Sequence, residues 1–337
     1  MRNAKVLLVA LVTGALLLGR GAAAATPEIV DAAYVADALQ RGGIVWDVRA
    51  TKDYAAGHVP GAVNIGNAGE TLRDPNREDF LATDVVEDIL NEAGIDLDRE
   101  VIVYGETGDP FAHWGLVAIR YFGGRSGKVY HGGIDDWKAA GRPVSTEPTK
   151  LPVASQKLVV QPEVLIYTKD VLAKMSDPNV QFLDVRTAKE YWGDDIRALR
   201  GGHIPGARNV AYEKNWVDPE LAKKLKDKQV KTRAGAALKS EDELKALYAD
   251  LDPKKETVVY CQSGVRAAET ANVLRALGFD KVRVYEESWL GYGNTLDAPA
   301  HNVTFVNVGA LQGRIGKLEA QLAELNARLE AAKKATP

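Results

Sequence analysis

The stretch Thr257-Val258-Val259-Tyr260-Cys261-Gln262-Ser263-Gly264-Val265-Arg266 decides the fold of the second half of this chain. Its first four residues form an apolar, β-branched run that is typical of a buried strand. Residues 267–277 are rich in alanine and predict a helix, while Gly264 permits a tight loop between the two elements. The sequence therefore predicts that Cys261 lies on a strand–loop–helix turn, where backbone N–H groups and the helix dipole stabilise an anion.

Cys261 is the only cysteine among 337 residues, and it has two interpretations. A single cysteine is most often a small buried hydrophobe. The glycine in the loop, the helix that follows and Arg266, which offers a fixed positive charge to an anionic substrate, favour a reactive thiol instead. In an exported protein a lone cysteine cannot form an intrachain disulfide, so it brings an oxidisable group without a structural gain.

Length and composition restrict the class of protein. A chain of 337 residues suits two domains, and 46% hydrophobic with 7% aromatic residues fits domains with proper cores. The net charge of −3 gives no electrostatic basis for nucleic-acid binding. His113 and His301 show no metal-ligand spacing, so we expect neither a metal site nor a cofactor.

The amino terminus has the composition of a secretory signal peptide. Arg2 and Lys5 precede an apolar run, residues 6–18, and a series of alanines follows. The run is short for a membrane span, so we expect cleavage after Ala24 or Ala25 and no stable membrane anchor afterwards. The expected location is outside the cytoplasm, in a bacterial periplasm.

The chain contains an internal repeat. Three segments of the first half return in the same order in the second half: Ile44–Arg49 as Gln181–Arg186, Gly57–Asn64 as Gly202–Asn209, and Glu100–Gly105 as Glu256–Cys261. A period of this length indicates a duplicated domain. Each half alternates short apolar strands with helix-like stretches, which predicts an α/β fold with a parallel sheet flanked by helices. Ligands of such sheets bind at the carboxyl ends of strands, where Cys261 stands.

These boundaries divide the chain into five parts. We expect a signal peptide, a first domain, a polar linker, a second domain and a helical tail, at residues 1–25, 27–145, 146–160, 161–300 and 301–337. The second domain contains an additional segment rich in Lys, Asp and Glu, residues 213–243, which we interpret as a surface excursion with helical pieces.

The repeated segments resemble rhodanese domains. The resemblance rests on the Asp-Val-Arg strand end, the Gly-His-Ile-Pro-Gly-Ala turn and the Val-Val-Tyr-Cys-x-x-Gly-x-Arg loop, and it covers the mature chain up to about Pro299. It implies a tandem-domain sulfurtransferase of the thiosulfate or 3-mercaptopyruvate type, with the catalytic cysteine in the second domain only. Gly105 and Pro110 stand where Cys261 and Arg266 stand, which fits a first domain without a nucleophile.

The resemblance also implies a mechanism with two steps. The Cys261 thiolate attacks the outer sulfur of a small anionic donor, and cyanide or a thiol then accepts the sulfur from the Cys261 persulfide. The loop that follows is expected to hold the substrate and the persulfide through residues Gln262, Ser263, Gly264, Val265 and Arg266.

Further residues are expected to support this site. Asp184 and Arg186 end a neighbouring strand and are expected to brace the loop, because the first half retains the same pair. Arg266 either attracts the donor or braces the loop through Asp184. Trp289 either lines the pocket or belongs to the core, and Glu286 is expected to be solvated.

The loop leaves the substrate and the reaction class partly open. Gln262 and Ser263 replace the basic residues of mitochondrial-type thiosulfate enzymes, while Arg266 replaces the threonine of mercaptopyruvate enzymes, so thiosulfate is favoured only modestly. A phosphatase or arsenate reductase needs a loop one residue longer than the four residues between Cys261 and Arg266. A persulfide carrier that delivers sulfur to a protein partner remains an alternative to an enzyme.

The tail carries a heptad pattern. Apolar residues recur at three- and four-residue spacing: Val308, Leu311, Ile315, Leu318, Leu322, Leu325 and Leu329. An isolated helix of this length is marginal in water. We therefore expect it either to join protomers in a short coiled coil, which would give a homo-oligomer, or to dock on its own domain or partly fray.

Overall fold

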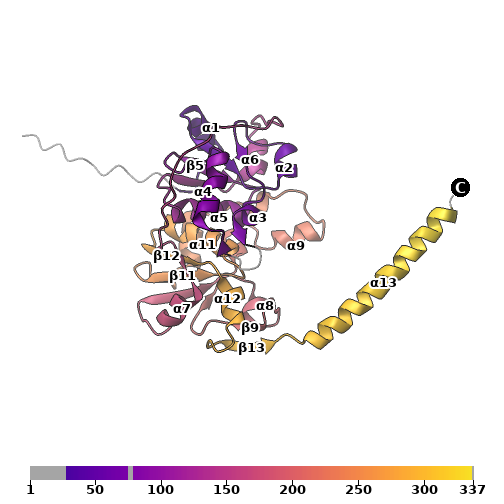
Figure 1. Ribbon diagram of the computed structural model, residues 1–337. Helices are drawn as coiled ribbons and strands as arrows, with labels where there is room; N and C mark the ends of the chain where they lie inside the picture. The colour runs from indigo at the N-terminus through magenta and orange to yellow at the C-terminus, as the bar shows by residue number, and fades with distance from the viewer. Residues whose placement is uncertain (1–27, 75–78, 336–337) are drawn as a thin grey trace, which may run out of the picture.

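The computed structural model describes residues 28–74 and 79–335. The expected signal peptide and its cleavage point lie outside these residues. Two α/β domains lie one above the other, and a long helix leaves the second of them (Figure 1). No helix within the described ranges combines the length and the hydropathy that a membrane span requires.

The first domain contains a four-stranded parallel sheet of order β2-β1-β5-β6. The strands are β1 (Ile44–Asp47), β2 (Val63–Asn64), β5 (Val101–Tyr104) and β6 (Gly127–Tyr130), with a separate antiparallel pair, β3 (Arg73–Asp74) and β4 (Asp79–Phe80). The helices are α1 (Ala32–Gln40), α2 (Thr51–Ala55), α3 (Ala68–Thr71), α4 (Thr83–Glu92), α5 (Pro110–Tyr121) and α6 (Gly133–Ala139). Strands β1, β5 and β6 are buried throughout, because helices cover both faces of a parallel sheet.

The second domain contains a five-stranded parallel sheet of order β10-β8-β11-β12-β7. Its strands are β7 (Leu165–Ile166), β8 (Val180–Asp184), β10 (Arg208–Asn209), β11 (Glu256–Tyr260) and β12 (Lys281–Tyr285). Its helices are α7 (Thr168–Lys174), α8 (Ala188–Trp192), α9 (Leu221–Lys226), α10 (Glu241–Leu247), α11 (Val265–Ala276) and α12 (Ser288–Asn294), with 3₁₀ turns η1 (Tyr212–Asn215) and η2 (Ala234–Ala236). The expected α/β fold with two parallel sheets is confirmed.

Strand β11 occupies the centre of its sheet. It pairs with β8 on one side and β12 on the other, with Tyr260 opposite Asp184. Its Thr-Val-Val-Tyr run is fully buried, which a central strand with two covered faces requires. The register places Cys261 at the carboxyl edge of the sheet.

The two domains share a hydrophobic core. Helices α5 and α11, which follow equivalent loops, pack against each other. One buried cluster contains side chains of both domains, among them Trp114 and Ala271. The segment expected as a linker runs along the first domain, where Ala154 N–H donates to Asn91 O over 2.9 Å. The domains are thus held together rather than tethered.

The excursion at residues 213–243 contains the helical pieces that the sequence predicts, and it also has a small core of its own. It forms η1, α9, η2 and the start of α10, and it has a small core of Trp216, Leu221 and Ala236. His131 Nε2 of the first domain bonds to Ala236 O over 2.7 Å. Trp216 and Ala236 of this core also lie beside Gly108 of the first domain.

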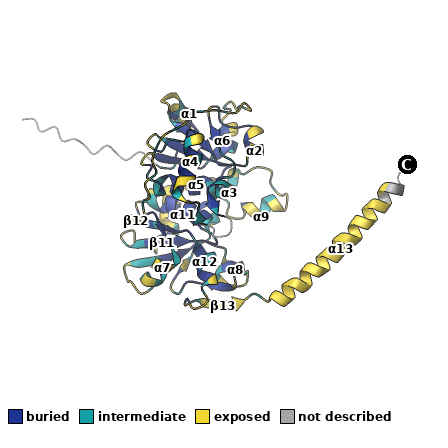
Figure 2. Cartoon of the chain, viewed as in Figure 1, coloured by how far each residue is buried: buried dark blue, intermediate teal, exposed yellow. Residues whose placement is uncertain are grey.

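The tail differs from the expected uniform helix. Residues 301–305 form β13 (His301–Phe305), which pairs antiparallel with β9 (Arg200–His203) of the second domain. The β-branched and aromatic residues Val303, Thr304 and Phe305 suit a strand better than a helix. Helix α13 (Val308–Ala335) follows, and its residues up to 331 are exposed (Figure 2).

Candidate active site around Cys261

One hydroxyl group, that of Ser288, anchors the loop between β11 and α11 through hydrogen bonds. Cys261 N–H and Gly264 N–H each donate to Ser288 Oγ over 3.0 Å, and Ser288 Oγ–H donates to Tyr285 O over 2.6 Å. Gly264 has φ of +81°, and Ser288 has φ of +49°, a left-handed conformation that is rare outside glycine. The glycine provides the tight turn that the sequence predicts.

The same loop presents a row of free amides. Within residues 28–74 and 79–335, the N–H groups of Gln262, Ser263, Arg266 and Ala267 have no hydrogen-bond acceptor. They belong to the loop and the first turn of α11, where the helix dipole is positive. Cys261 itself is 1% exposed and lies at the edge of the core. The arrangement suits a small anion bound at the cysteine.

Arg266 pairs with Glu190 and not with Asp184, the partner that one of its two expected roles named. Its Nη1 and Nη2 donate to the two carboxylate oxygens of Glu190 over 2.9 and 2.8 Å. Burial alone would raise the pKa of Glu190, but the hydrogen bond and charge of Arg266 lower that pKa to about 2. Burial would lower the pKa of Arg266, and Glu190 and the negative charge of the Cys261 thiolate raise it. The guanidinium therefore lies within electrostatic reach of the thiolate.

Asp184 and Arg186 brace a different loop from the one expected. Arg186 donates to Asp184 Oδ2 and to Gly202 O over 2.6 and 2.7 Å. The pair thus fixes the Gly-His-Ile-Pro-Gly turn, because its hydrogen bonds within the described residues reach that turn and not the Cys261 loop. Arg49 makes the same contacts with Asp47 in the first domain.

Trp289 and Gln262 attach the site to its surroundings. Trp289 is 1% exposed and donates from Nε1 to Arg200 O over 2.9 Å, so it belongs to the core. Its backbone N–H donates to Cys261 O over 3.0 Å. Gln262 Nε2 donates to Arg197 O over 2.6 Å. Of the remaining loop residues, Val265 is buried in the shared core.

A residue of the first domain reaches the loop, which sequence reasoning missed. Arg73 on β3 donates from Nη2 to Ser263 O over 2.9 Å and pairs with Glu286 over 3.2 Å. Glu286 is 0% exposed and accepts a hydrogen bond from Trp114 Nε1 over 3.1 Å. The expectation of a solvated Glu286 is therefore wrong, since the first domain covers it.

Of the two residues that sequence reasoning missed, Ser288 has a signal in the sequence and Arg73 has none. Ser288 stands where the repeat has Gly133, which also has a positive φ, so the alignment of the two halves contains a signal for it. Arg73 lies between repeated segments and has no such signal.

The equivalent loop of the first domain is filled by a carboxyl group. A Cβ atom added at Gly105 would lie 2.2 Å from Asp109 Oδ2. Asp109 accepts from Phe111 N–H over 2.9 Å and so caps α5, and burial raises the pKa of its carboxyl to about 6. The first domain thus lacks both a nucleophile and the space for one.

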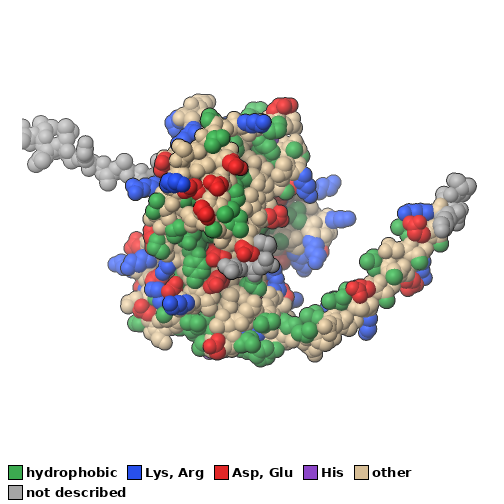
Figure 3. Space-filling view, viewed as in Figure 1, with side chains coloured by type: hydrophobic (Ala, Val, Ile, Leu, Met, Phe, Trp, Pro, Cys, Tyr) green, Lys and Arg blue, Asp and Glu red, His purple; other side chains and the backbone are tan. Residues whose placement is uncertain are grey.

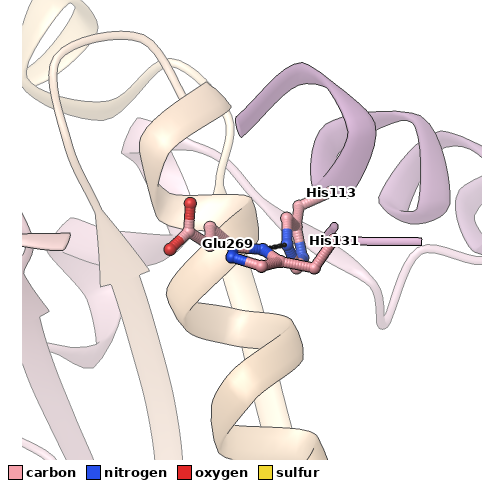
Figure 4. Close-up of side chains that lie close together, drawn as sticks. All are labelled: His113, His131 and Glu269. Carbon is pink, nitrogen blue, oxygen red and sulfur yellow. Dashed lines mark hydrogen bonds between the residues drawn. The ribbon is translucent and has the colours of Figure 1, made fainter. Parts of the chain in front are cut away.

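A buried group at the domain interface contains His113, His131 and Glu269 (Figure 4). Asn272 Nδ2 can only donate to His113 Nδ1, and Ala236 O can only accept from His131 Nε2. His113 Nε2–H therefore donates to His131 Nδ1 over 2.9 Å. Neither imidazole retains a lone pair for a cation, so the group fits a chain of hydrogen bonds better than a metal site.

Known proteins resemble this chain over most of its length. The model of the rhodanese-like domain matches twice, at residues 31–140 and 168–295. A thiosulfate sulfurtransferase of Corynebacterium glutamicum is 36% identical over 258 residues, which cover 73% of this chain and 80% of that protein. A sulfur carrier protein, TtuD, of Thermus thermophilus is 30% identical over 73% of this chain and 86% of its own length.

A solved structure extends the likeness to the fold. The anaerobic ergothioneine biosynthesis enzyme of Chlorobium limicola superposes with a TM-score of 0.67 at 22% identity, over 81% of this chain and 69% of that one. At this identity the likeness concerns the fold alone. The two matched domains and the relatives at 30–36% identity place the whole body of the chain in one family. The protein therefore belongs to the rhodanese-like family and carries two of its domains in tandem.

Proposed function

We propose that this protein is a sulfurtransferase that moves a sulfane sulfur from a small anionic donor to a nucleophilic acceptor through a persulfide on Cys261. Thiosulfate is the favoured donor, and cyanide or a thiol is the acceptor. The observation that carries the proposal is the row of free amides at the start of α11 beside the single cysteine. The name of the Corynebacterium glutamicum relative supports the choice of donor.

The first step forms the persulfide. The Cys261 thiolate attacks the outer sulfur of thiosulfate, a new S–S bond forms, and the S–S bond of the donor breaks so that sulfite leaves with its electron pair. The free amides of Gln262, Ser263, Arg266 and Ala267 then stabilise the negative charge on the terminal sulfur. In the second step cyanide attacks that sulfur, which gives thiocyanate and restores the thiolate.

Arg266 contributes a positive charge to the site of sulfur transfer. Glu190 accepts one N–H of each terminal nitrogen, so the guanidinium is anchored to the carboxylate in a fixed position. The guanidinium lies within electrostatic reach of Cys261. The loop amides supply hydrogen bonds to the transferred sulfur, and Arg266 adds a positive charge beside them.

The test is the intact mass of the protein after incubation with thiosulfate. We expect a gain of one sulfur atom, which cyanide removes and which Cys261→Ser abolishes. A parallel sample with 3-mercaptopyruvate identifies the better donor. No gain of sulfur from either donor would contradict the proposal.

A persulfide carrier is a second candidate, which the sulfur carrier of Thermus thermophilus favours. A carrier would load one sulfur but turn over slowly with cyanide or small thiols. Steady-state thiocyanate production separates the two functions, since an enzyme makes many equivalents per cysteine.

We also propose that the protein acts in the periplasm. The support is the basic, apolar and alanine-rich order of residues 2–25. Amino-terminal sequencing of the protein from a periplasmic fraction should begin after Ala24 or Ala25, and an intact Met1 would contradict export with cleavage.

A further inference from the structure

Two arginines make equivalent contacts across the domain interface. Arg73 of the first domain donates to Ser263 O over 2.9 Å, and Arg233 of the second domain donates to Thr107 O over 2.8 Å. Ser263 and Thr107 are each the second residue after the position of the cysteine in their own loop. Each domain therefore holds the loop of the other by the same carbonyl group.

The two contacts differ in their surroundings. Arg73 and Glu286 are 3% and 0% exposed, whereas Arg233 and its partner Glu106 are 29% and 47% exposed. Trp114 lies beneath the Arg73 guanidinium, 5.4 Å from its ring centre. A buried ion pair with a fixed geometry is more rigid than an exposed one. The contact of Arg73 with the cysteine loop is therefore more rigid than the contact of Arg233 with the loop of the first domain.

The contact with Arg73 fixes one particular peptide group. The carbonyl of Ser263 accepts from Arg73, and the N–H of the same peptide, on Gly264, donates to Ser288 Oγ. Glu286 Oε2 would lie 2.7 Å from a Cβ atom at Gly264, so the carboxylate also abuts the turn. Both ends of this peptide are therefore held, which sets the direction of the free amides on either side.

We propose that Arg73 is a positioning residue that aims the amides of the Cys261 loop, and this inference rests on the proposed sulfur transfer. The first domain, which has no nucleophile, contributes to the reaction by this contact. Arg233 makes the matching contact with the inactive loop and is therefore a control for interface stability alone.

The experiment compares Arg73→Lys with Arg233→Lys. A lysine keeps the charge but cannot hold a carbonyl and a carboxylate with a planar fork. We expect Arg73→Lys to lower kcat for thiocyanate formation about tenfold with KM for thiosulfate changed less than about twofold, because small displacements of reacting groups slow catalysis. Arg233→Lys should leave kcat within about twofold of the wild type, since it touches only the inactive loop. Thermal unfolding of both variants measures the structural cost.

The outcomes are separable. Equal kcat for the two variants, or a loss of kcat that only follows a loss of folded protein, would overturn the positioning role of Arg73. A wild type that takes no sulfur would instead overturn the proposed function, whichever result the variants give.

Helix α13 carries an independent inference. It extends away from both domains, and apolar side chains follow one another along it (Figure 3). Its seven heptad residues, Val308, Leu311, Ile315, Leu318, Leu322, Leu325 and Leu329, are between 49% and 60% exposed. Gly313 and Gly316 fall outside this stripe, so they weaken the helix without interrupting the apolar face.

The composition of the stripe points to a second copy of the chain. Val308 and Ile315 occupy the first two a positions and leucine the next two, Leu322 and Leu329. The first two heptads, with a β-branched residue at a and leucine at d, favour two parallel strands. In a parallel pair Arg314 faces Glu319 of the other copy, an attractive contact across the seam. Arg328 faces Lys333 near the helix end, but each already pairs within its own helix, with Glu324 and Glu330.

We infer that α13 joins two copies of the protein in a parallel coiled coil. Light scattering of the mature protein should give the mass of a dimer, and Leu318→Glu with Leu322→Glu should give a monomer. Ala320→Glu with Ala323→Glu, on the outer face, is the matched control and should remain dimeric. A monomeric wild type would overturn the inference.

The direction of the helices has its own test. Because Cys261 is the only cysteine, Leu311→Cys in a Cys261→Ser background places one thiol at the start of the stripe. A parallel pair brings the two thiols together, so mild oxidation should give a covalent dimer. A dimer by mass without this crosslink would contradict the parallel arrangement.

Discussion

At the scale of single residues, Ser288 distinguishes the support of the two loops. The first domain has Gly133 at this position, with φ of +57°, and a Cβ atom there would lie 2.4 Å from Gly105 O. Ser288 accepts a left-handed conformation that costs about 1 kcal/mol, and its hydroxyl in return binds the amides of Cys261 and Gly264. Ser288 therefore adopts a strained backbone conformation at the position where its hydroxyl anchors the loop.

Substitutions of Ser288 should separate its strain from its hydrogen bonds. Ser288→Ala leaves two buried N–H groups without an acceptor and retains the strain, so we expect a loss of about 2 kcal/mol of unfolding free energy. Ser288→Gly relieves the strain and should lose only about 1 kcal/mol. Both should slow the loading of sulfur about tenfold, because the loop amides lose their anchor. Urea unfolding and intact mass against time measure the two effects. Unchanged stability of Ser288→Ala would contradict this account.

At the scale of elements, the two halves use one strand–loop–helix unit in two ways. In the second half the loop surrounds Cys261 and the first turn of α11 has free amides. In the first half Asp109 caps α5, and its carboxyl group takes the space of a side chain at Gly105. The difference between an active and an inactive loop is thus local, although the backbones follow the same path from strand to helix.

A cysteine introduced at Gly105 should not be enough to make the loop of the first domain accept sulfur. In a Cys261→Ser background, Gly105→Cys should take no sulfur from thiosulfate, because Asp109 occupies the same space and adds negative charge. We also expect a loss of about 2 kcal/mol of stability from overpacking. Intact mass and thermal unfolding measure both effects. A persulfide on the introduced thiol would show that the carboxyl group of Asp109 moves aside.

At the scale of the whole molecule, one buried cluster at the domain interface, His113, His131 and Glu269, consists of neutral groups. Burial lowers the pKa of His131 to about 4 and the pKa of His113 as well. Burial raises the pKa of Glu269 to about 8, the charges of Glu213 and Asp109 add to this, and hydrogen bonds from Trp216 and Asn215 oppose it. All three side chains are uncharged when they meet near neutral pH.

Glu269 should make the stability of the protein fall as pH rises from 4.5 to about 8. Its pKa rises from 4.5 to about 8 on folding, so the stabilisation is complete below pH 4.5 and is lost as pH rises through 8. The side chain in Glu269→Gln cannot ionise. We therefore expect the melting temperature of this variant, measured relative to that of the wild type, to increase between about pH 5 and pH 9. The histidines act in another window, since their lowered pKa values remove stability as pH falls below 6.5 in both proteins. A constant difference in melting temperature would contradict a buried, protonated Glu269.

Local patterns in the sequence determined much of this protein. The apolar run of β11, Gly264 and the alanine-rich helix are neighbours along the chain, so their order alone predicts where Cys261 stands. The repeat predicts two similar domains, because equal patterns fold into equal elements, and the comparison of Gly105 with Cys261 predicts which of them lacks the thiol.

Only the tertiary structure decided which charged groups meet. Arg266 pairs with Glu190, which lies 76 residues away, and Arg73 reaches Ser263 across 190 residues. The sequence shows that a buried arginine needs a hydrogen-bond acceptor, but it does not show which one, because many carboxylates and carbonyls could accept. Glu286 shows the same limit, since its burial depends on a surface that belongs to the other domain. The packing of α5 against α11 holds the two domains against each other, so that Arg73 and Trp114 can meet Ser263 and Glu286, and no local pattern encodes that contact.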